Sequence, residues 1–403
     1  MRLNNNFDLL SKSYLFSEVK KRVENFSRNH PDLKVIRMDI GDVSLPLPEG
    51  VCKAMDKAAY DMSKSDTFMG YGPEQGYAWL REKIALNDYQ MRNIDIKADE
   101  VFVSDGAKCD IANLTDIFDP NAVVAMQDPV YPVYFDSNVI ASRTVENGRI
   151  KLLHSGPETR FKPEIPREKV DVVYLCSPNN PTGTALDRND LKKWVDYALE
   201  NDALIIYDSA YEAFIFNQAI PKSIYEIPGA EKVAIEVRSY SKTAGFTGLR
   251  CGYTVVPFAL TKEIEPGKRV PVRDLWLRRQ TTKFNGASYI IQRGAEALYD
   301  EKIKGYLTDN IKYYLRNASM LRDALEDQGL NVYGGEFSPY VWLKADNGMD
   351  SWSLFDLILE KCHLSSTPGV GFGRNGEGCI RFTGFNTFEN TVKAVERLRN
   401  LKL

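Results

Sequence analysis

The sequence predicts an α/β fold in which a mostly parallel sheet is covered by helices on both faces. Between about residue 100 and residue 257, short segments rich in Val and Ile alternate with helix-like stretches. Several of these segments lack polar alternation, as strands buried on both faces do. Strands that alternate with helices are typical of parallel sheets. The predicted strands are 101–103, 122–126, 172–176, 204–207, 233–237 and 251–256.

The intervening and following stretches predict helices and a second, smaller α+β domain. Asp187 can cap a helix over 187–201, with Leu191, Trp194 and Leu199 on one face. A long helix is predicted over 299–330, and its apolar stripe is read as core packing. Short strands at 340–343 and 379–382 follow, as in a small α+β domain.

Composition and charge exclude several classes of protein. A chain of 403 residues suggests two or three domains, or one large α/β unit with an appendage. The 52 Lys and Arg residues nearly balance 55 Asp and Glu residues, so the formal charge is −3 and the basic surplus of a nucleic-acid binder is missing. No apolar run reaches the length of a membrane span, and the polar first ten residues do not resemble a signal peptide. We therefore expect a cytoplasmic protein without membrane contact.

Histidines and cysteines are scattered. His30, His154 and His363 each stand alone, and the six cysteines form no C-x-x-C pair. We therefore expect no metal site and no disulfide frame, and read the cysteines as packing residues in a reducing compartment. Proton transfer near neutral pH should then use a group other than histidine.

Polar groups follow five of the predicted strands. Because ligands of open α/β sheets bind at the carboxyl ends of strands, these positions are the first candidates for a site. Each is a weak signal alone, since an Asp after a strand is more often a helix cap, but their order and joint spacing indicate a shared site. The segments are 104–108, 127–131, 177–183, 207–211 and 239–242.

Four motifs in this region resemble the fold type I pyridoxal-phosphate (PLP) aminotransferases. They are Asn180-Pro-Thr-Gly, Asp208-x-x-Tyr211, Ser239-x-Ser241-Lys242 and Arg250 eight residues later. The resemblance implies a large domain over 49–287 with a mostly parallel seven-stranded sheet. It also implies a small domain built from 1–48 and 288–403.

The resemblance also implies how the cofactor is held. Lys242 would bond covalently to PLP, and Asp208 would keep its ring nitrogen protonated, which its action as an electron sink requires. Asn180 and Tyr211 would bond the phenolic oxygen. The phosphate would lie against arginine and the start of a helix. The remaining cofactor residues would be Ala107, Lys108, Ser239, Ser241 and Arg250, with the ring of Tyr131 stacked on the cofactor.

A narrower resemblance, over about residues 10–385, is to the LL-diaminopimelate aminotransferase family. Its more discriminating pieces are Glu74-Gln-Gly and Thr243-Ala-Gly-Phe-Thr-Gly. It implies transamination between LL-2,6-diaminopimelate and 2-oxoglutarate, which physiologically runs from tetrahydrodipicolinate and L-glutamate in lysine biosynthesis. Lys242, with Asp208 and Tyr211, would be catalytic, its amine moving the proton as a general base.

Substrate residues follow from the same resemblance. Arg381 would grip the α-carboxylate with the help of Asn180. From a partner subunit in a homodimer, Tyr71 would reach the cofactor phosphate and Glu74 the distal end of the substrate. A distal ammonium needs such a carboxylate. The other residues of the substrate pocket would be Tyr14, Gly41, Lys108, Tyr131 and Asn285.

Several alternatives stay open. The same fold could serve an aminotransferase for aspartate, an aromatic or another diamino acid, or a PLP β-lyase. A nicotinamide-dependent oxidoreductase would use the G-x-G-x-x-G pattern at 371–376, but a predicted strand follows that pattern, so we read it as a turn leading to Arg381. A PLP-sensing regulator would need a DNA-binding segment, and none precedes residue 40.

Overall fold

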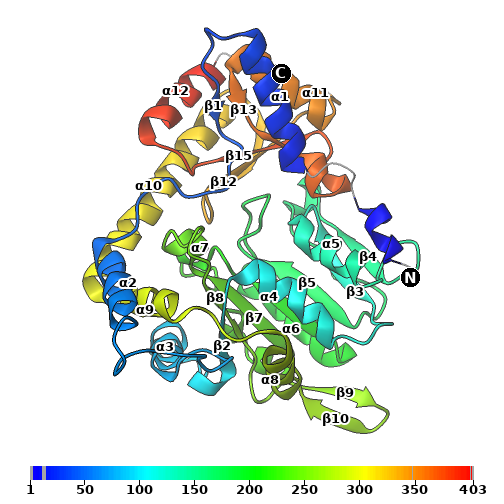
Figure 1. The fold of residues 1–403 in the computed structure, drawn as a ribbon. Helices are drawn as coiled ribbons and strands as arrows, with labels where there is room; N and C mark the ends of the chain where they lie inside the picture. The colour runs from blue at the N-terminus through cyan, green and yellow to red at the C-terminus, as the bar shows by residue number, and fades with distance from the viewer. Residues whose placement is uncertain (1–2, 11–14, 347, 400, 402–403) are drawn as a thin grey trace.

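Two sheets organise the chain, one in the lower and one in the upper part of the view in Figure 1. The computed structural model describes residues 3–10, 15–346, 348–399 and 401. Tyr14, predicted to line the substrate pocket, lies outside the described residues.

The lower sheet has seven strands in the order β2-β8-β7-β6-β5-β3-β4. Neighbouring strands run parallel except β8, which is antiparallel to both β2 and β7. The predicted mostly parallel sheet is therefore confirmed. Its strands are β2 (Val101–Ser104), β3 (Val124–Asp128), β4 (Ile150–His154), β5 (Val172–Cys176), β6 (Leu204–Asp208), β7 (Ala234–Ser239) and β8 (Gly252–Val255).

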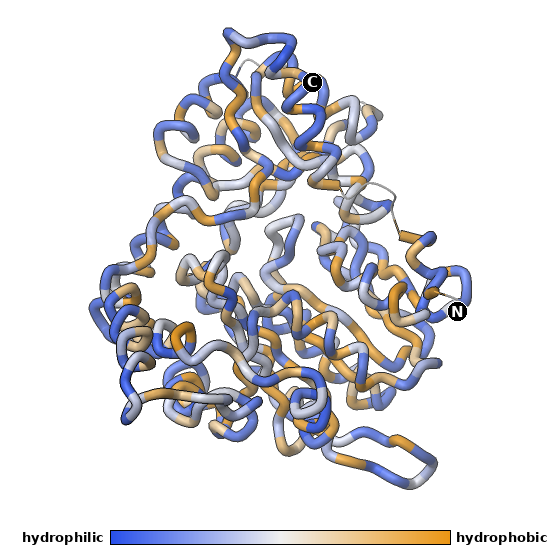
Figure 2. Tube along the Cα trace, in the orientation of Figure 1, coloured by the Kyte–Doolittle hydropathy of each residue, from blue (hydrophilic) through white to orange (hydrophobic). Residues whose placement is uncertain are grey.

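The inner strands of the lower sheet are buried on both faces, because successive side chains along each strand pack into two different cores. On β5, Val173 and Leu175 point to one core, whereas Val172, Tyr174 and Cys176 point to the other. Figure 2 shows hydrophobic segments along these interior strands. The first core is covered by α2 (Glu49–Asp61), α3 (Ala78–Ile84), α6 (Arg188–Asn201) and α9 (Tyr289–Ala297). The second is covered by α4 (Ala107–Leu114), α5 (Pro132–Ile140) and α8 (Val272–Lys283).

Both predicted helices are present, with ends that differ from the predicted ones. Asp187 caps α6, because its carboxylate accepts the backbone N–H groups of Asn189 and Asp190. Leu191 and Trp194 are buried as expected, but Leu199 is 44% exposed, so its assignment to the core face was wrong. The long helix is α10 (Glu301–Glu326), which starts two residues later than predicted, where Asp300 caps it, and ends four residues earlier. It runs from the lower to the upper part of the molecule (Figure 1).

The upper sheet is antiparallel, in the order β11-β12-β15-β14. Its strands are β11 (Asn331–Gly334), β12 (Tyr340–Lys344), β14 (Thr367–Pro368) and β15 (Cys379–Thr383). Side chains of α1 (Leu15–Asn29), α11 (Ser351–Cys362) and α12 (Phe388–Leu398) join its core. In addition, β1 (Ile36–Arg37) pairs with β13 (Leu364–Ser365), so the N-terminal segment lies with the C-terminal one.

A short hairpin of β9 (Thr261–Glu265) and β10 (Lys268–Pro271) projects from the lower part of the molecule (Figure 1). This hairpin was not predicted from the sequence. Asp202 holds its base through Lys262 and Arg269, each 2.9 Å away. The described residues contain no helix with the length and apolar character needed to cross a membrane. The same residues hold no group of His, Cys, Asp or Glu side chains arranged to bind a metal ion.

Candidate active site

A cavity of about 560 Å³ lies where β5, β6 and β7 end, below the upper sheet. We call it the strand-end cavity. Three larger hollows, of about 590, 920 and 930 Å³, are not lined by any predicted site residue that the structure describes. The predicted residues that line the strand-end cavity are Gly41, Ala107, Lys108, Tyr131, Asn180, Asp208, Tyr211, Ser239, Ser241, Lys242, Arg250 and Arg381.

Asp208 is the last residue of β6 and points its carboxylate into this cavity. One carboxylate oxygen accepts the hydroxyl of Tyr134 at 2.6 Å, and the other accepts the Ala210 backbone N–H at 3.0 Å. Burial raises the pKa of Asp208 above its ordinary value. Because both donors are neutral, a cationic partner such as a protonated ring nitrogen would stabilise the buried charge.

Lys242 lies on the short helix α7 (Tyr240–Thr243), which begins where β7 ends. Its Nζ donates to the Gly41 carbonyl at 2.5 Å and lies 3.9 Å from the Asp42 carboxylate. Burial lowers the pKa of Lys242 to about 8, helped by the charges of Arg381 and Arg250 and opposed by Asp42. A lysine of this pKa is partly neutral near pH 7, so it can act as a nucleophile and as a base.

An anion cradle forms between α7 and the start of α4. Ser239 caps α7 by accepting the Ser241 N–H at 3.1 Å, and Arg250 reaches the Ser241 hydroxyl at 3.4 Å. At Gly106, where φ is +125°, an added Cβ would come within 2.7 Å of the Arg250 guanidinium. Only glycine therefore lets Arg250 lie against the N-terminus of α4. Hydroxyls, a guanidinium and a helix start in one place suit a phosphate.

Arg381 comes from β15 in the upper sheet and is only 2% exposed. It donates to the Asn180 side-chain oxygen at 2.7 Å and to the Asp39 carbonyl at 3.1 Å, and both acceptors are neutral groups. Its buried Nε has no hydrogen-bond partner among the described residues. A buried guanidinium that lines a cavity and meets neutral acceptors suits a carboxylate ligand, which would balance its charge.

Three side chains without a predicted role lie directly against predicted site residues. Tyr134 bonds Asp208, Asp42 lies near Lys242, and the Tyr340 hydroxyl lies 2.7 Å from that of Tyr211. Tyr134 had a usable signal, because the first turn of a helix that follows a strand end faces the same edge of the sheet. Tyr340 had none, because it begins a predicted strand of the small domain and stands in no recognisable motif.

Three predicted residues do not line the cavity of their own chain. Tyr71 is 92% exposed, and Glu74 and Asn285 are also absent from the lining that the structure describes. Their segments lie against each other, because a Cβ added to Gly286 would come 2.9 Å from the Pro73 carbonyl. The structure therefore brings the backbone segments around Glu74 and Asn285 together, outside the lining of this chain's cavity.

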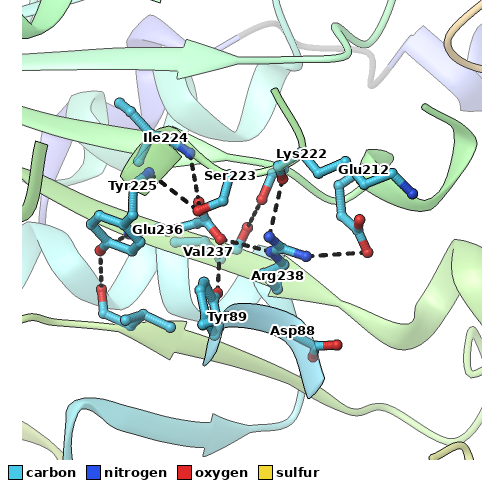
Figure 3. Close-up of polar contacts among 12 residues, drawn as sticks. Asp88, Tyr89, Glu212, Lys222, Ser223, Ile224, Tyr225, Glu236, Val237 and Arg238 are labelled. Carbon is cyan, nitrogen blue, oxygen red and sulfur yellow. Dashed lines mark hydrogen bonds and ion pairs between the residues drawn. The ribbon is translucent and has the colours of Figure 1, made fainter. Parts of the chain in front are cut away.

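A buried charge network lies behind the site (Figure 3). Arg238, next to Ser239, donates Nε to Glu236 at 2.7 Å and lies 3.1 Å from Glu212, which directly follows Tyr211. Glu236 also accepts the Tyr89 hydroxyl at 2.7 Å. Arg238 thus ties the segment that carries Asp208 and Tyr211 to the segment that carries Lys242.

Glu236→Gln should lower the free energy of unfolding by about 3 kcal/mol, since it leaves Arg238 buried with one carboxylate fewer. Glu236 is fully buried, so solvent cannot compensate the loss. Urea denaturation measures the change. The matched control is Glu265→Gln, an exposed partner of Lys268, which should change the value by less than about 0.5 kcal/mol. Equal effects of the two substitutions would contradict the stabilising role of the network.

The cavity therefore combines the groups that a PLP enzyme acting on a carboxylate substrate requires. They are the amine of Lys242 with its lowered pKa, the buried carboxylate of Asp208, the anion cradle and the buried guanidinium of Arg381. The chain belongs to the class I and II aminotransferases, whose family model matches residues 34–398. It is therefore a PLP-dependent aminotransferase, and the predicted cofactor is confirmed.

Known relatives agree over nearly the whole chain. An LL-diaminopimelate aminotransferase of Methanosphaera stadtmanae is 50% identical, covering 100% of this chain and 99% of the relative. One of Parabacteroides distasonis is 52% identical, covering 98% of each chain. The solved L,L-diaminopimelate aminotransferase of Chlamydomonas reinhardtii is 41% identical, with a TM-score of 0.91 over 98% of each chain.

The oxidoreductase alternative is wrong. The glycine pattern at 371–376 spans two 3-10 turns, Gly369–Phe372 and Arg374–Gly376, which lead into β15. It does not join a strand to a helix, as a dinucleotide site requires. The turn before Arg381 is as predicted.

Proposed function

We propose that the chain transfers an amino group between LL-2,6-diaminopimelate and 2-oxoglutarate. Physiologically it would form LL-diaminopimelate from tetrahydrodipicolinate and L-glutamate, in lysine biosynthesis in the cytoplasm. This choice of substrate rests on the two LL-diaminopimelate aminotransferases that are 50% and 52% identical to the chain over nearly their full length. Arg381 carries the chemistry, because its buried guanidinium lines the cavity and donates to the neutral oxygens of Asn180 and Asp39.

In the proposed mechanism, Arg381 and Asn180 orient the substrate by its α-carboxylate. The α-carbon would then lie near Lys242, whose neutral amine would carry the proton between the substrate α-carbon and the C4′ carbon of PLP. The Gly41 carbonyl holds that amine when it is free. Asp208, which accepts the Tyr134 hydroxyl, would keep a proton on the ring nitrogen of PLP. When bound, PLP would supply the electron sink for the reaction.

The cofactor would be held by the residues of the anion cradle and its surroundings. Ser239, Ser241 and Arg250 would take the phosphate, together with the N–H groups of Ala107 and Lys108 at the start of α4. The ring of Tyr131 would stack on the cofactor. Asn180 and Tyr211 would bond its phenolic oxygen.

We also propose a homodimer whose sites are shared. Tyr71, Glu74 and Asn285 would enter the cavity of the partner, which accounts for the 92% exposure of Tyr71 in the single chain. Glu74 would meet the distal ammonium of the substrate. We also propose a division into a large domain (49–287) and a small one (1–48 and 288–403). Ala295 and Leu307, which follow residue 287, pack in the core of the large sheet.

Mixing two inactive variants tests the shared site. Glu74→Ala and Lys242→Ala should each be inactive with LL-diaminopimelate, but a mixed dimer regains one intact site. Random exchange makes half of the dimers mixed, so we expect about one quarter of the wild-type activity. Native mass spectrometry confirms the exchange. Exchange without recovery of activity would contradict a shared site.

Substrate specificity is tested by offering amino donors with 2-oxoglutarate as acceptor. LL-Diaminopimelate should give a kcat/KM at least about a hundredfold above those of aspartate and aromatic amino acids, because these lack the distal ammonium for Glu74. The meso isomer is the sharpest comparison, since it differs only at the distal carbon. A preference for aspartate or an aromatic donor would contradict the proposed substrate, but not the aminotransferase fold.

A further inference from the structure

Tyr340 lies where the two sheets meet, at the start of β12 in the upper sheet. It lines the strand-end cavity and is 1% exposed. Its hydroxyl is 2.7 Å from the Tyr211 hydroxyl, and its ring centre is 4.4 Å from the Arg381 guanidinium carbon. One side chain thus touches a proposed cofactor contact and the proposed substrate arginine.

The hydroxyl pair restricts where the Tyr211 proton can point. Both tyrosines are buried, and their rings meet edge to face at 5.3 Å. If Tyr340 donates to the Tyr211 oxygen, the proton of Tyr211 is left to point into the cavity. Hydrogen bonds in series polarise one another, so Tyr211 then becomes a stronger donor.

The ring of Tyr340 acts on the other side of the cavity. The face of an aromatic ring attracts a guanidinium, most strongly where water is excluded. The rings of Tyr340 and Phe372, at 4.4 and 4.9 Å, flank Arg381. They hold the guanidinium in place without neutralising its charge, which stays available for a carboxylate.

We propose that Tyr340 is a positioning residue for both halves of the site. Its hydroxyl directs the Tyr211 proton toward the cofactor, and its ring holds Arg381 in place for the substrate carboxylate. This inference rests on the proposed cofactor contact of Tyr211. It is independent of the proposed preference for diaminopimelate.

Two substitutions separate the hydroxyl from the ring. Tyr340→Phe removes only the hydroxyl and weakens the hydrogen bond of Tyr211 to the cofactor. More negative charge then stays on the cofactor oxygen, which favours the protonated chromophore. We expect the pH midpoint of the visible absorbance of the holoenzyme to rise by about half a unit. The dissociation constant of glutarate, a carboxylate without an amino group, should stay within about twofold.

Tyr340→Leu removes the ring as well. We expect the same rise in the spectral midpoint, and in addition a dissociation constant for glutarate about tenfold higher, because Arg381 loses its aromatic support. Tyr197→Phe is the matched control, because Tyr197 is a buried tyrosine on α6 whose hydroxyl bonds the Glu168 carbonyl. It should change neither readout.

Tyr211→Phe distinguishes failure of this inference from failure of its premise. It should raise the spectral midpoint by about one unit, and Tyr340→Phe added to it should give no further rise. A rise in Tyr211→Phe without one in Tyr340→Phe overturns the role of Tyr340 alone. No rise in either variant overturns the cofactor contact of Tyr211 as well. If Tyr340→Leu does not fold, the titration of Tyr340→Phe decides.

Discussion

Lys242→Ala should lower turnover by at least about 10⁴-fold and abolish the visible absorbance of the lysine-bound cofactor. Both effects have one cause, since the same amine bonds the cofactor and moves the substrate proton. The Gly41 carbonyl and the Asp42 carboxylate hold that amine at the strand-end cavity. Stopped-flow transamination assays and absorbance spectra measure the two effects.

The pKa of Lys242, lowered to about 8, gives this prediction a pH dependence. At pH 7 about 10% of such amines are neutral, against about 0.03% for an ordinary lysine. The rate at which the cofactor-free protein captures PLP should therefore rise about tenfold for each unit of increasing pH up to pH 7. Above pH 8 the rate should level off. Lys53→Ala, on the exposed face of α2, should leave the profile unchanged. Retained transamination in Lys242→Ala, or a profile that still rises at pH 10, would contradict this role.

Arg381→Ala should lower kcat/KM about a thousandfold for the amino donor and the oxo acid alike. The reason is that both substrates present a carboxylate to the same guanidinium, whose fork can bond two oxygens at once. Arg381→Lys should recover little, because an ammonium cannot bond Asn180 and a carboxylate in the same geometry. Steady-state kinetics for both half-reactions measure the change.

A surface arginine provides the control for Arg381. Arg167 is exposed, and Arg167→Ala should leave kcat/KM within about twofold of wild type. Binding of glutarate to the holoenzyme, measured without turnover, should be lost in Arg381→Ala and kept in Arg167→Ala. A loss that affects only one of the two substrates would place their carboxylates at different residues.

The arrangement of the lower sheet could be predicted because its strands are apolar on both faces. The segments at 172–176 and 204–207 have this character, and β5 and β6 form there. Strand β4 was missed since it lies at the edge of the sheet, where Lys151 and His154 interrupt the apolar run. β4 buries fewer of its side chains than β2 at the other edge, and its sequence therefore resembles a loop.

Most of the cavity lining could be predicted because it comes from short motifs at strand ends. Tyr340 and the buried Arg238–Glu212 pair could not, because they depend on contacts between segments far apart in the chain. The distance between the Tyr211 and Tyr340 hydroxyls follows only from how the upper sheet lies over the lower one. No spacing along the sequence carries that information.

The scarcity of histidines fits the site. His154 pairs with Glu158 on the surface, and His363 ends α11 in a left-handed conformation. Among the described residues that line the strand-end cavity there is no histidine. Lys242 lines it, and its pKa responds to the charges of Asp42, Arg250 and Arg381. The general base expected from the sequence is thus a lysine made suitable by burial.

Chemical trapping of the cofactor identifies the lysine that holds it. Borohydride reduction of the holoenzyme fixes PLP to the lysine that holds it, and peptide mass spectrometry then identifies that residue. We expect one modified lysine per chain, Lys242, in the peptide that contains Ser239 and Ser241. Modification at another lysine, or no modification of PLP-loaded protein, would contradict the assignment of the strand-end cavity as the active site.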